Sequence, residues 1–114
     1  MLPKANRLRR NRDFRKIYQK SRKFRADFFI IRYLPNNLPD SRIGIVISAK
    51  AVKKAVRRNL LKRKISEIIR LNLNKIKPGL DIIISVFQMP EDLSSSTLTQ
   101  TVIKNLALAK IIND

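Results

Sequence analysis

The chain has 114 residues and a formal net charge of +18, because 26 lysines and arginines outnumber eight acidic residues. Such an imbalance disfavours the free compact state and favours polyanionic partners. The chain has no cysteine and no histidine, which excludes disulfides, thiolate metal sites and histidine-based acid–base catalysis. Its hydrophobic fraction of 44% is that of an ordinary globular protein.

The length predicts one domain, residues 1–114, with a modest core. No run of about 18 apolar residues occurs, so we expect no membrane-spanning helix and no membrane partner. The N-terminal segment is basic but lacks the apolar centre of a signal peptide. A cytoplasmic location is therefore the default expectation.

Residues 1–25 predict a short lead and then a helix that begins near Asn11. Phe14, Ile17 and Tyr18 recur at three- and four-residue spacing and share one face of this helix. Such a face is most often buried. Alternatively, Phe14 and Tyr18 are partly exposed in a basic cleft and stack on unpaired bases. Basic residues surround this face: Arg7, Arg9, Arg10, Arg12, Arg15, Lys16, Lys20, Arg22, Lys23 and Arg25.

Three segments carry the signature of strands. Residues 28–34 form the first, with Arg32 on the face opposite Tyr33. Residues 42–48 form the second, and the short proline-containing loop between the two favours an antiparallel hairpin. Residues 80–87 are apolar almost throughout, which predicts a central position in the sheet.

The central helix is expected over about residues 51–73 and carries nine basic residues against one acid between positions 50 and 70. Like charges at helical spacing repel, and a polyanion along the helix would relieve that repulsion. A merely solvated basic face is the alternative, although solvated helices normally mix their signs. The expected core face is Leu61, Ile65, Ile68 and Ile69. A second face carries Ala55, Asn59, Lys62, Arg63, Ser66 and Arg70.

Pro78 and Gly79 end this segment, and Ser94 to Ser96 offer N-caps for a last helix over about residues 96–111. The predicted order is helix, strand, strand, helix, strand, helix. The chain is therefore expected to be a small α/β protein.

Catalytic patterns are scarce in this chain. Glu91 and Asp92 are the one close carboxylate pair, and they read as a solvated turn rather than half of a two-metal site. With only Gly44 and Gly79, the chain has no glycine-rich phosphate loop. The residues alone indicate a basic binding module for structured nucleic acid, with any chemistry supplied by its partner.

Several short motifs in order carry a resemblance to a known family. The chain resembles the protein subunit of bacterial ribonuclease P over nearly its whole length. The matching pieces are RL at 7–8, DF at 13–14, RIGI at 42–45, Ser48, Lys50, AV at 55–56, RN at 58–59, KR at 62–63, Glu67 and Asp81.

The resemblance implies a ribonucleoprotein that hydrolyses one phosphodiester bond and removes the 5′ leader of precursor tRNA. It also implies that an RNA subunit with bound Mg²⁺ performs the chemistry, and that a monomeric protein binds the catalytic RNA and the leader in a 1:1 complex. The implied fold is an α/β sandwich with a left-handed β-α-β crossover, against the general right-handed rule.

The resemblance further assigns two groups of residues. The first group is expected to bind the catalytic RNA and consists of Arg58, Asn59, Lys62 and Arg63, with further cations at Lys50, Lys53, Lys54, Arg57 and Arg70. The leader is assigned to a cleft with Phe14, Tyr18, Arg32, Arg7, Arg9 and Arg10. Leu60, Ser66 and Ala49 stand where the family usually has a basic residue, and Arg32 stands in place of a strand aromatic, which favours phosphate over base contact.

Other functions remain open at this point. A ribosomal or other structural RNA-binding protein would satisfy the charge equally well. A protein-only nuclease would require a carboxylate such as Asp81 to be catalytic. A membrane-active cationic helix fits less well, because the basic helix is joined to strands rich in core residues.

Overall fold

The computed structural model describes residues 2–112. It confirms the α/β class and the predicted order, with one added strand. The elements are α1 (Asn11–Lys20), β1 (Arg22–Arg25), β2 (Phe29–Pro35), β3 (Arg42–Ile47), α2 (Ala55–Leu71), β4 (Leu80–Val86) and α3 (Ser95–Leu108), with short 3-10 turns at Lys4–Asn6 and Leu73–Lys75.

The four strands form one mixed sheet in the order β1-β2-β4-β3. β4 is central as predicted: Ile84 pairs with Ile31 of antiparallel β2 and with Ile45 of parallel β3. The predicted hairpin between residues 28–34 and 42–48 is wrong, because β4 lies between those strands. A strand that is apolar on both faces is best buried at the centre, and α2 provides the long crossover that parallel pairing needs.

β1 is an edge strand that the sequence did not indicate. It pairs antiparallel with β2, from Arg22 opposite Tyr33 to Arg25 opposite Ile30. Three of its four residues are cations, which keeps an open sheet edge from pairing with other chains.

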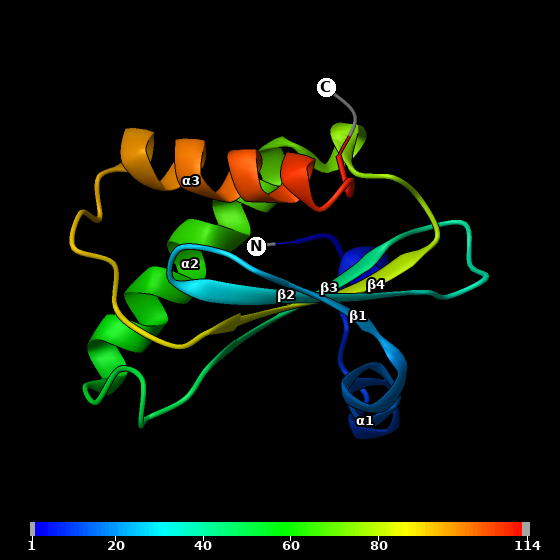
Figure 1. The fold of residues 1–114 in the computed structure, drawn as a ribbon, viewed down its shortest axis with the longest axis horizontal. Coiled ribbons are helices and arrows are strands. Elements are labelled where there is room, and N and C mark those ends of the chain that lie inside the picture. The colour runs from blue at the N-terminus through cyan, green and yellow to red at the C-terminus, as the bar shows by residue number, and fades with distance from the viewer. Residues whose placement is uncertain (1, 113–114) are drawn as a thin grey trace.

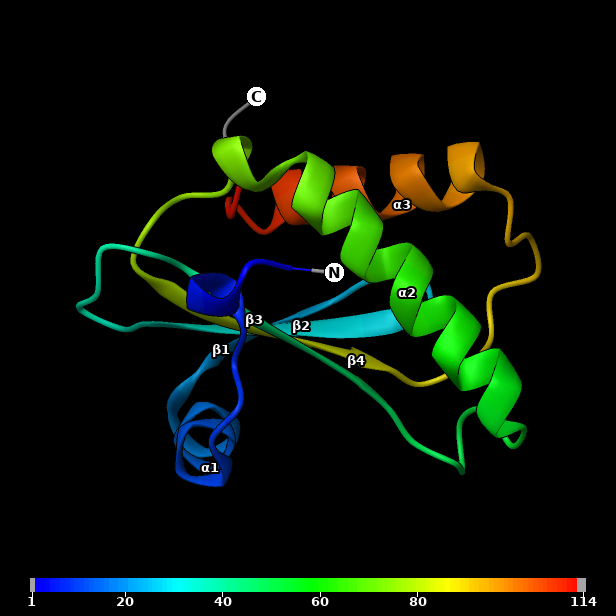
Figure 2. The same ribbon diagram turned by 180° about the vertical axis from the view of Figure 1, so that it is seen from behind.

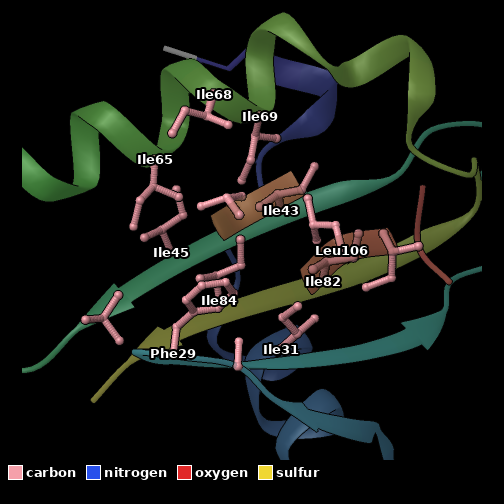
Figure 3. Close-up of a cluster of buried hydrophobic side chains, with 14 of the residues drawn as sticks. Phe29, Ile31, Ile43, Ile45, Ile65, Ile68, Ile69, Ile82, Ile84 and Leu106 are labelled. Atoms are coloured by element: carbon pink, nitrogen blue, oxygen red, sulfur yellow. The ribbon is translucent and has the colours of Figure 1, made fainter. Parts of the chain in front are cut away.

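The helices lie on opposite faces of the sheet. α2 and α3 cover one face and α1 lies against the other (Figures 1 and 2). The larger core fills the space under α2 and α3, where Ile65 and Ile69 meet Ile43, Ile45 and Ile84 (Figure 3). The predicted core face of α2 is confirmed, since Leu61, Ile65, Ile68 and Ile69 are all buried.

A separate, smaller cluster holds α1 to the sheet. It consists of buried Leu8, Ile17 and Ile83, with Phe14, Leu34 and Val46 packed around them. Of the expected apolar face of α1, only Ile17 is fully buried, while Phe14 is half-buried and Tyr18 is exposed.

Helix ends follow local hydrogen bonding. α2 begins at Ala55 rather than near residue 51, because the backbone N–H of Ala51 donates to the Ser48 side chain at 3.0 Å and closes a turn. At α3, the predicted serine cap is confirmed: the Ser94 hydroxyl accepts from the backbone N–H of Thr97. No helix in the described range is long and apolar enough to cross a bilayer.

Candidate nucleic-acid interface

A groove of about 1190 Å³ runs beside β3, between the N-terminal segment and α2. β3 is the edge strand on this side of the sheet, with α1 and α2 on either side of it in Figure 2. The N-terminal segment is fixed along β3, because the backbone N–H of Leu8 donates to the carbonyl of Ile43 at 3.0 Å. The groove is therefore walled by segments that lie some fifty positions apart in the sequence.

The α2 wall of the groove carries the face predicted to bind RNA. Asn59, Lys62 and Arg63 line it with exposed side chains, and half-buried Ser66 lies beside them. Leu60 also lines this wall and is half-buried. The wall thus combines cations, an amide and an apolar side chain, which are the groups that contact phosphates and bases.

The opposite wall carries part of the predicted leader cleft. Arg7, Arg9 and Phe14 line the groove together with the α2 residues. The Phe14 ring lies directly on the backbone of Gly44, where a Cβ atom would be only 2.7 Å from the ring Cζ. Glycine at this position therefore sets how closely α1 approaches β3.

Tyr18 and Arg32 lie together, but outside the lining of that groove. The Arg32 guanidinium lies over the Tyr18 ring, 4.7 Å from its centroid. Arg32 also donates from Nη1 to the Ser85 hydroxyl at 3.2 Å. The Tyr18 side chain is 44% exposed, so this stacked pair presents an aromatic surface and a positive charge on the α1 side of the sheet.

A second cation–aromatic pair lies nearby in the sheet and was missed from the sequence. The Arg25 guanidinium is 4.3 Å from the centroid of the Phe87 ring. Strand alternation puts Phe87 on the same face as Ser85, two residues earlier. Only the pairing of β1 with β2 could have indicated that Arg25 reaches this face.

Arg42 connects three parts of the fold. Its Nε and Nη2 donate to the two carboxylate oxygens of Asp81 at 2.8 and 2.6 Å, and its Nη1 lies 3.3 Å from Asp13 of α1. Asn36 also donates to Asp81, at 2.9 Å. The hydrogen bonds to Asp81 raise the pKa of Arg42, against the opposing effect of burial. Asp81 is thus a structural ion-pair partner.

The remaining predicted cations lie elsewhere. Arg58 donates from Nη1 to the carbonyls of Val52 and Lys53 at 2.8 and 2.9 Å, so it closes the turn before α2. Arg70 pairs with Glu67 on the surface, and this hydrogen bond lowers the pKa of Glu67. Five of the other predicted cations are also exposed and lie outside the groove lining: Arg10, Lys50, Lys53, Lys54 and Arg57.

Among residues 2–112, no group of three or more acidic side chains could hold a metal ion. Asp92 instead helps begin α3: the backbone N–H of Ser94 donates to it at 2.8 Å, and hydrogen bonds from Ser94 and Thr97 lower its pKa. Asp92 therefore has a structural role at the start of α3.

The fold and the groove define a small basic α/β protein with a surface suited to RNA. The family model "Ribonuclease P" matches residues 2–110, and the chain belongs to this family. The ribonuclease P protein component of Pseudanabaena is 38% identical, with 99% of this chain and 98% of the relative covered. That of Thermotoga maritima is 40% identical over 71% of this chain and 68% of the relative.

Solved structures agree with these sequence matches. The RNase P protein of Staphylococcus aureus superposes with a TM-score of 0.85 at 31% identity, over 96% of this chain and all of that chain. The T. maritima protein superposes with a TM-score of 0.78 at 32% identity, over 95% of this chain and 98% of that chain. The predicted role as the protein subunit of ribonuclease P is confirmed, and a ribosomal role is not favoured.

Proposed function

We propose that this chain binds the catalytic RNA of ribonuclease P on the α2 wall of the groove and holds the 5′ leader of precursor tRNA on the α1 side of the sheet. One observation carries the proposal. Lys62 and Arg63 meet Arg7 and Arg9 across a single groove, although the two pairs come from distant parts of the chain. Cations on the two walls can neutralise the phosphates of two RNA segments that meet in the groove.

We propose that the bond cleavage itself belongs to the RNA partner and its Mg²⁺. The described acidic groups do not converge on a metal position, and the chain has no histidine. The protein would then act as one RNA-binding domain, residues 1–114, in a 1:1 complex in the cytoplasm. Its part is to bind and orient RNA.

A cleavage assay on leader-bearing precursor tRNA at low Mg²⁺ tests this function. It compares the protein alone, a bacterial catalytic RNA alone, and the two together. Cleavage at the mature 5′ end only in the mixture is the expected result. Cleavage by the protein alone would place catalytic groups on the chain, and no stimulation by the protein would refute its role as a subunit.

A second candidate function comes from one structural relative. The S. aureus structure with a TM-score of 0.87 and 30% identity is described as an RNase P protein mutant with defective mRNA degradation activity. A messenger RNA substrate incubated with the protein alone tests whether this chain acts in that way. Full-length messenger RNA after incubation would exclude the activity.

Replacing Asn59 and Arg63 together by alanine is expected to weaken association with the catalytic RNA and to raise the Mg²⁺ concentration the holoenzyme needs. Loss of the Arg63 phosphate contact should also lower the slope of log K against log salt by about 1. Titration at several salt concentrations measures both. An unchanged slope and Mg²⁺ optimum would show that this α2 face does not contact RNA.

Replacing Tyr18 by alanine is expected to cost about 1–3 kcal/mol of leader binding, because a base stacked on its exposed ring would lose that contact. The measurement is the affinity for leader-bearing tRNA relative to mature tRNA. Phenylalanine at the same position keeps the ring and serves as the control. Equal losses for both RNAs would indicate a folding defect instead.

A further inference from the structure

We propose that the groove beside β3 holds one unpaired nucleobase, whose hydrogen-bonding edge meets the open backbone of this strand. The protein would thereby distinguish single-stranded from paired RNA at this position. The inference rests on the proposed RNA-binding function and adds to it what part of the nucleotide is recognised.

The first support is the open edge of β3. The carbonyl of Ile43 points away from β4, because it accepts a hydrogen bond from the backbone N–H of Leu8 at 3.0 Å. Arg7 and Ile43 form an isolated parallel β-bridge. The N–H and C=O of a residue point to the same side of a strand, and the side alternates along the strand. Ile45, two residues on, therefore presents its N–H and C=O at the same edge, inside the groove.

The second support is the chemistry of that edge. The Watson–Crick edge of every nucleobase has a hydrogen-bond donor next to an acceptor, and in a duplex these groups are already paired. A backbone N–H and C=O at a strand edge offer the complementary acceptor and donor, as in strand addition by peptides. Ile45 can therefore bind any unpaired base and no paired one.

The third support is the composition of the walls. Leu60 on α2 and Leu8 and Phe14 on the other side offer apolar surface for the flat faces of a base. Lys62 and Arg63 lie on the same α2 wall for the flanking phosphates. The volume of about 1190 Å³ exceeds that of a usual small-ligand pocket, so a base and its neighbouring backbone fit.

The positive charge of the groove walls indicates which kind of partner the groove binds. A strand edge can also accept a peptide, but cations line both walls of this groove and the chain carries +18. A polyanion with an exposed base at each phosphate satisfies both the edge and the walls. Single-stranded RNA is the partner with this chemistry.

The test measures binding of three oligonucleotides of equal length and charge to the full chain. They are oligouridine, its N3-methyl analogue, whose Watson–Crick edge is blocked while its faces remain, and an abasic strand. Because Tyr18 can also stack on bases, the protein carries Tyr18→Ala throughout. Oligouridine is expected to bind roughly 5- to 150-fold tighter than the abasic strand, the range of one base contact, with the N3-methyl strand between them.

Leu60→Ala in the same background is expected to lower the oligouridine-to-abasic ratio, because the base loses its apolar contact on the α2 wall, and Leu60→Met is expected to restore it. Val56→Ala is the matched control, because Val56 lies on the same helix, is 77% exposed and does not line the groove. Circular dichroism verifies that each variant is folded.

Three results would overturn the proposal. Equal binding of the uridine and N3-methyluridine strands would show that the backbone of β3 makes no hydrogen bond to the Watson–Crick edge of a base. An unchanged oligouridine-to-abasic ratio in Leu60→Ala would show that the base binds elsewhere. If an acidic peptide displaced the oligonucleotides and the protein showed no preference among the three strands, the edge of β3 would be a peptide-binding site. None of these results depends on pre-tRNA cleavage, so the subunit role is judged separately.

Discussion

Replacing Arg42 by alanine is expected to lower the free energy of unfolding by about 3–5 kcal/mol, because it leaves a buried carboxylate without its ion-pair partner. Asp81 is only 6% exposed and receives both arms of the Arg42 guanidinium. Among the described side chains, the neutral amide of Asn36 is then its remaining hydrogen-bond donor, and the negative charge has no ion-pair partner. Urea denaturation monitored by circular dichroism measures the loss.

Two further substitutions separate the contributions of Arg42. Arg42→Lys keeps the charge but loses the bidentate geometry. Its free energy of unfolding should therefore lie between those of the wild type and Arg42→Ala. Asp13→Asn removes only the charge of the α1 partner, which lies 3.3 Å from Arg42. It should lower the free energy of unfolding far less than Arg42→Ala does. A loss below about 1 kcal/mol in Arg42→Ala, the scale of an exposed ion pair, would refute the role assigned to this network.

The second large effect is expected from Gly44→Ala. The new methyl group would lie 2.7 Å from Phe14 Cζ and 2.9 Å from Cε1, so the ring must move away from β3. Overpacking of this kind typically costs about 1–3 kcal/mol of stability. Because Phe14 also lines the groove, RNA binding should weaken at the same time.

A double-mutant cycle identifies the cause. Phe14→Leu removes the clashing ring atoms, so Gly44→Ala should cost clearly less in that background than in wild type. The two losses would simply add if the glycine were needed for another reason, such as the flexibility of β3. Thermal unfolding and RNA titration of the four proteins provide both readouts.

The sequence was sufficient to predict the buried face of the central helix, although not its first residue. The 3.6-residue period identified Leu61, Ile65, Ile68 and Ile69 as the buried face, and all four are buried. The same period put Asn59, Lys62 and Arg63 on another face, which lines the groove. Local periodicity determines this result, because a helix with one apolar face has one way to bury it.

The sheet depended on information that local patterns do not carry. β1 is too charged to read as a strand, and only its pairing with β2 makes it one. The short loop before β3 favoured a hairpin, whereas the fully apolar β4 takes the central place between β2 and β3. Strand pairing is decided by burial across the whole sheet, which is a long-range property.

The structure brings part of the predicted site together in one groove, which is lined by Arg7, Arg9, Phe14, Asn59, Lys62 and Arg63. Phe14 and Tyr18 were expected in one cleft, yet Phe14 lines the groove with Asn59 while Tyr18 stacks with Arg32 outside it. Residues four apart on a helix share a face, but a short helix crossing a sheet offers its two ends to different neighbours. Arg58 was assigned to RNA, but its hydrogen bonds go to the backbone before α2.

The two unequal cores imply that the molecule opens in parts. Three fully buried side chains, Leu8, Ile17 and Ile83, hold α1 to the sheet, whereas the opposite face shares one large core with α2 and α3. Segments with few buried contacts exchange their amide hydrogens through local opening at low free energy. Amides of α1 should therefore exchange with deuterium before those of β4, and bound RNA should slow them selectively.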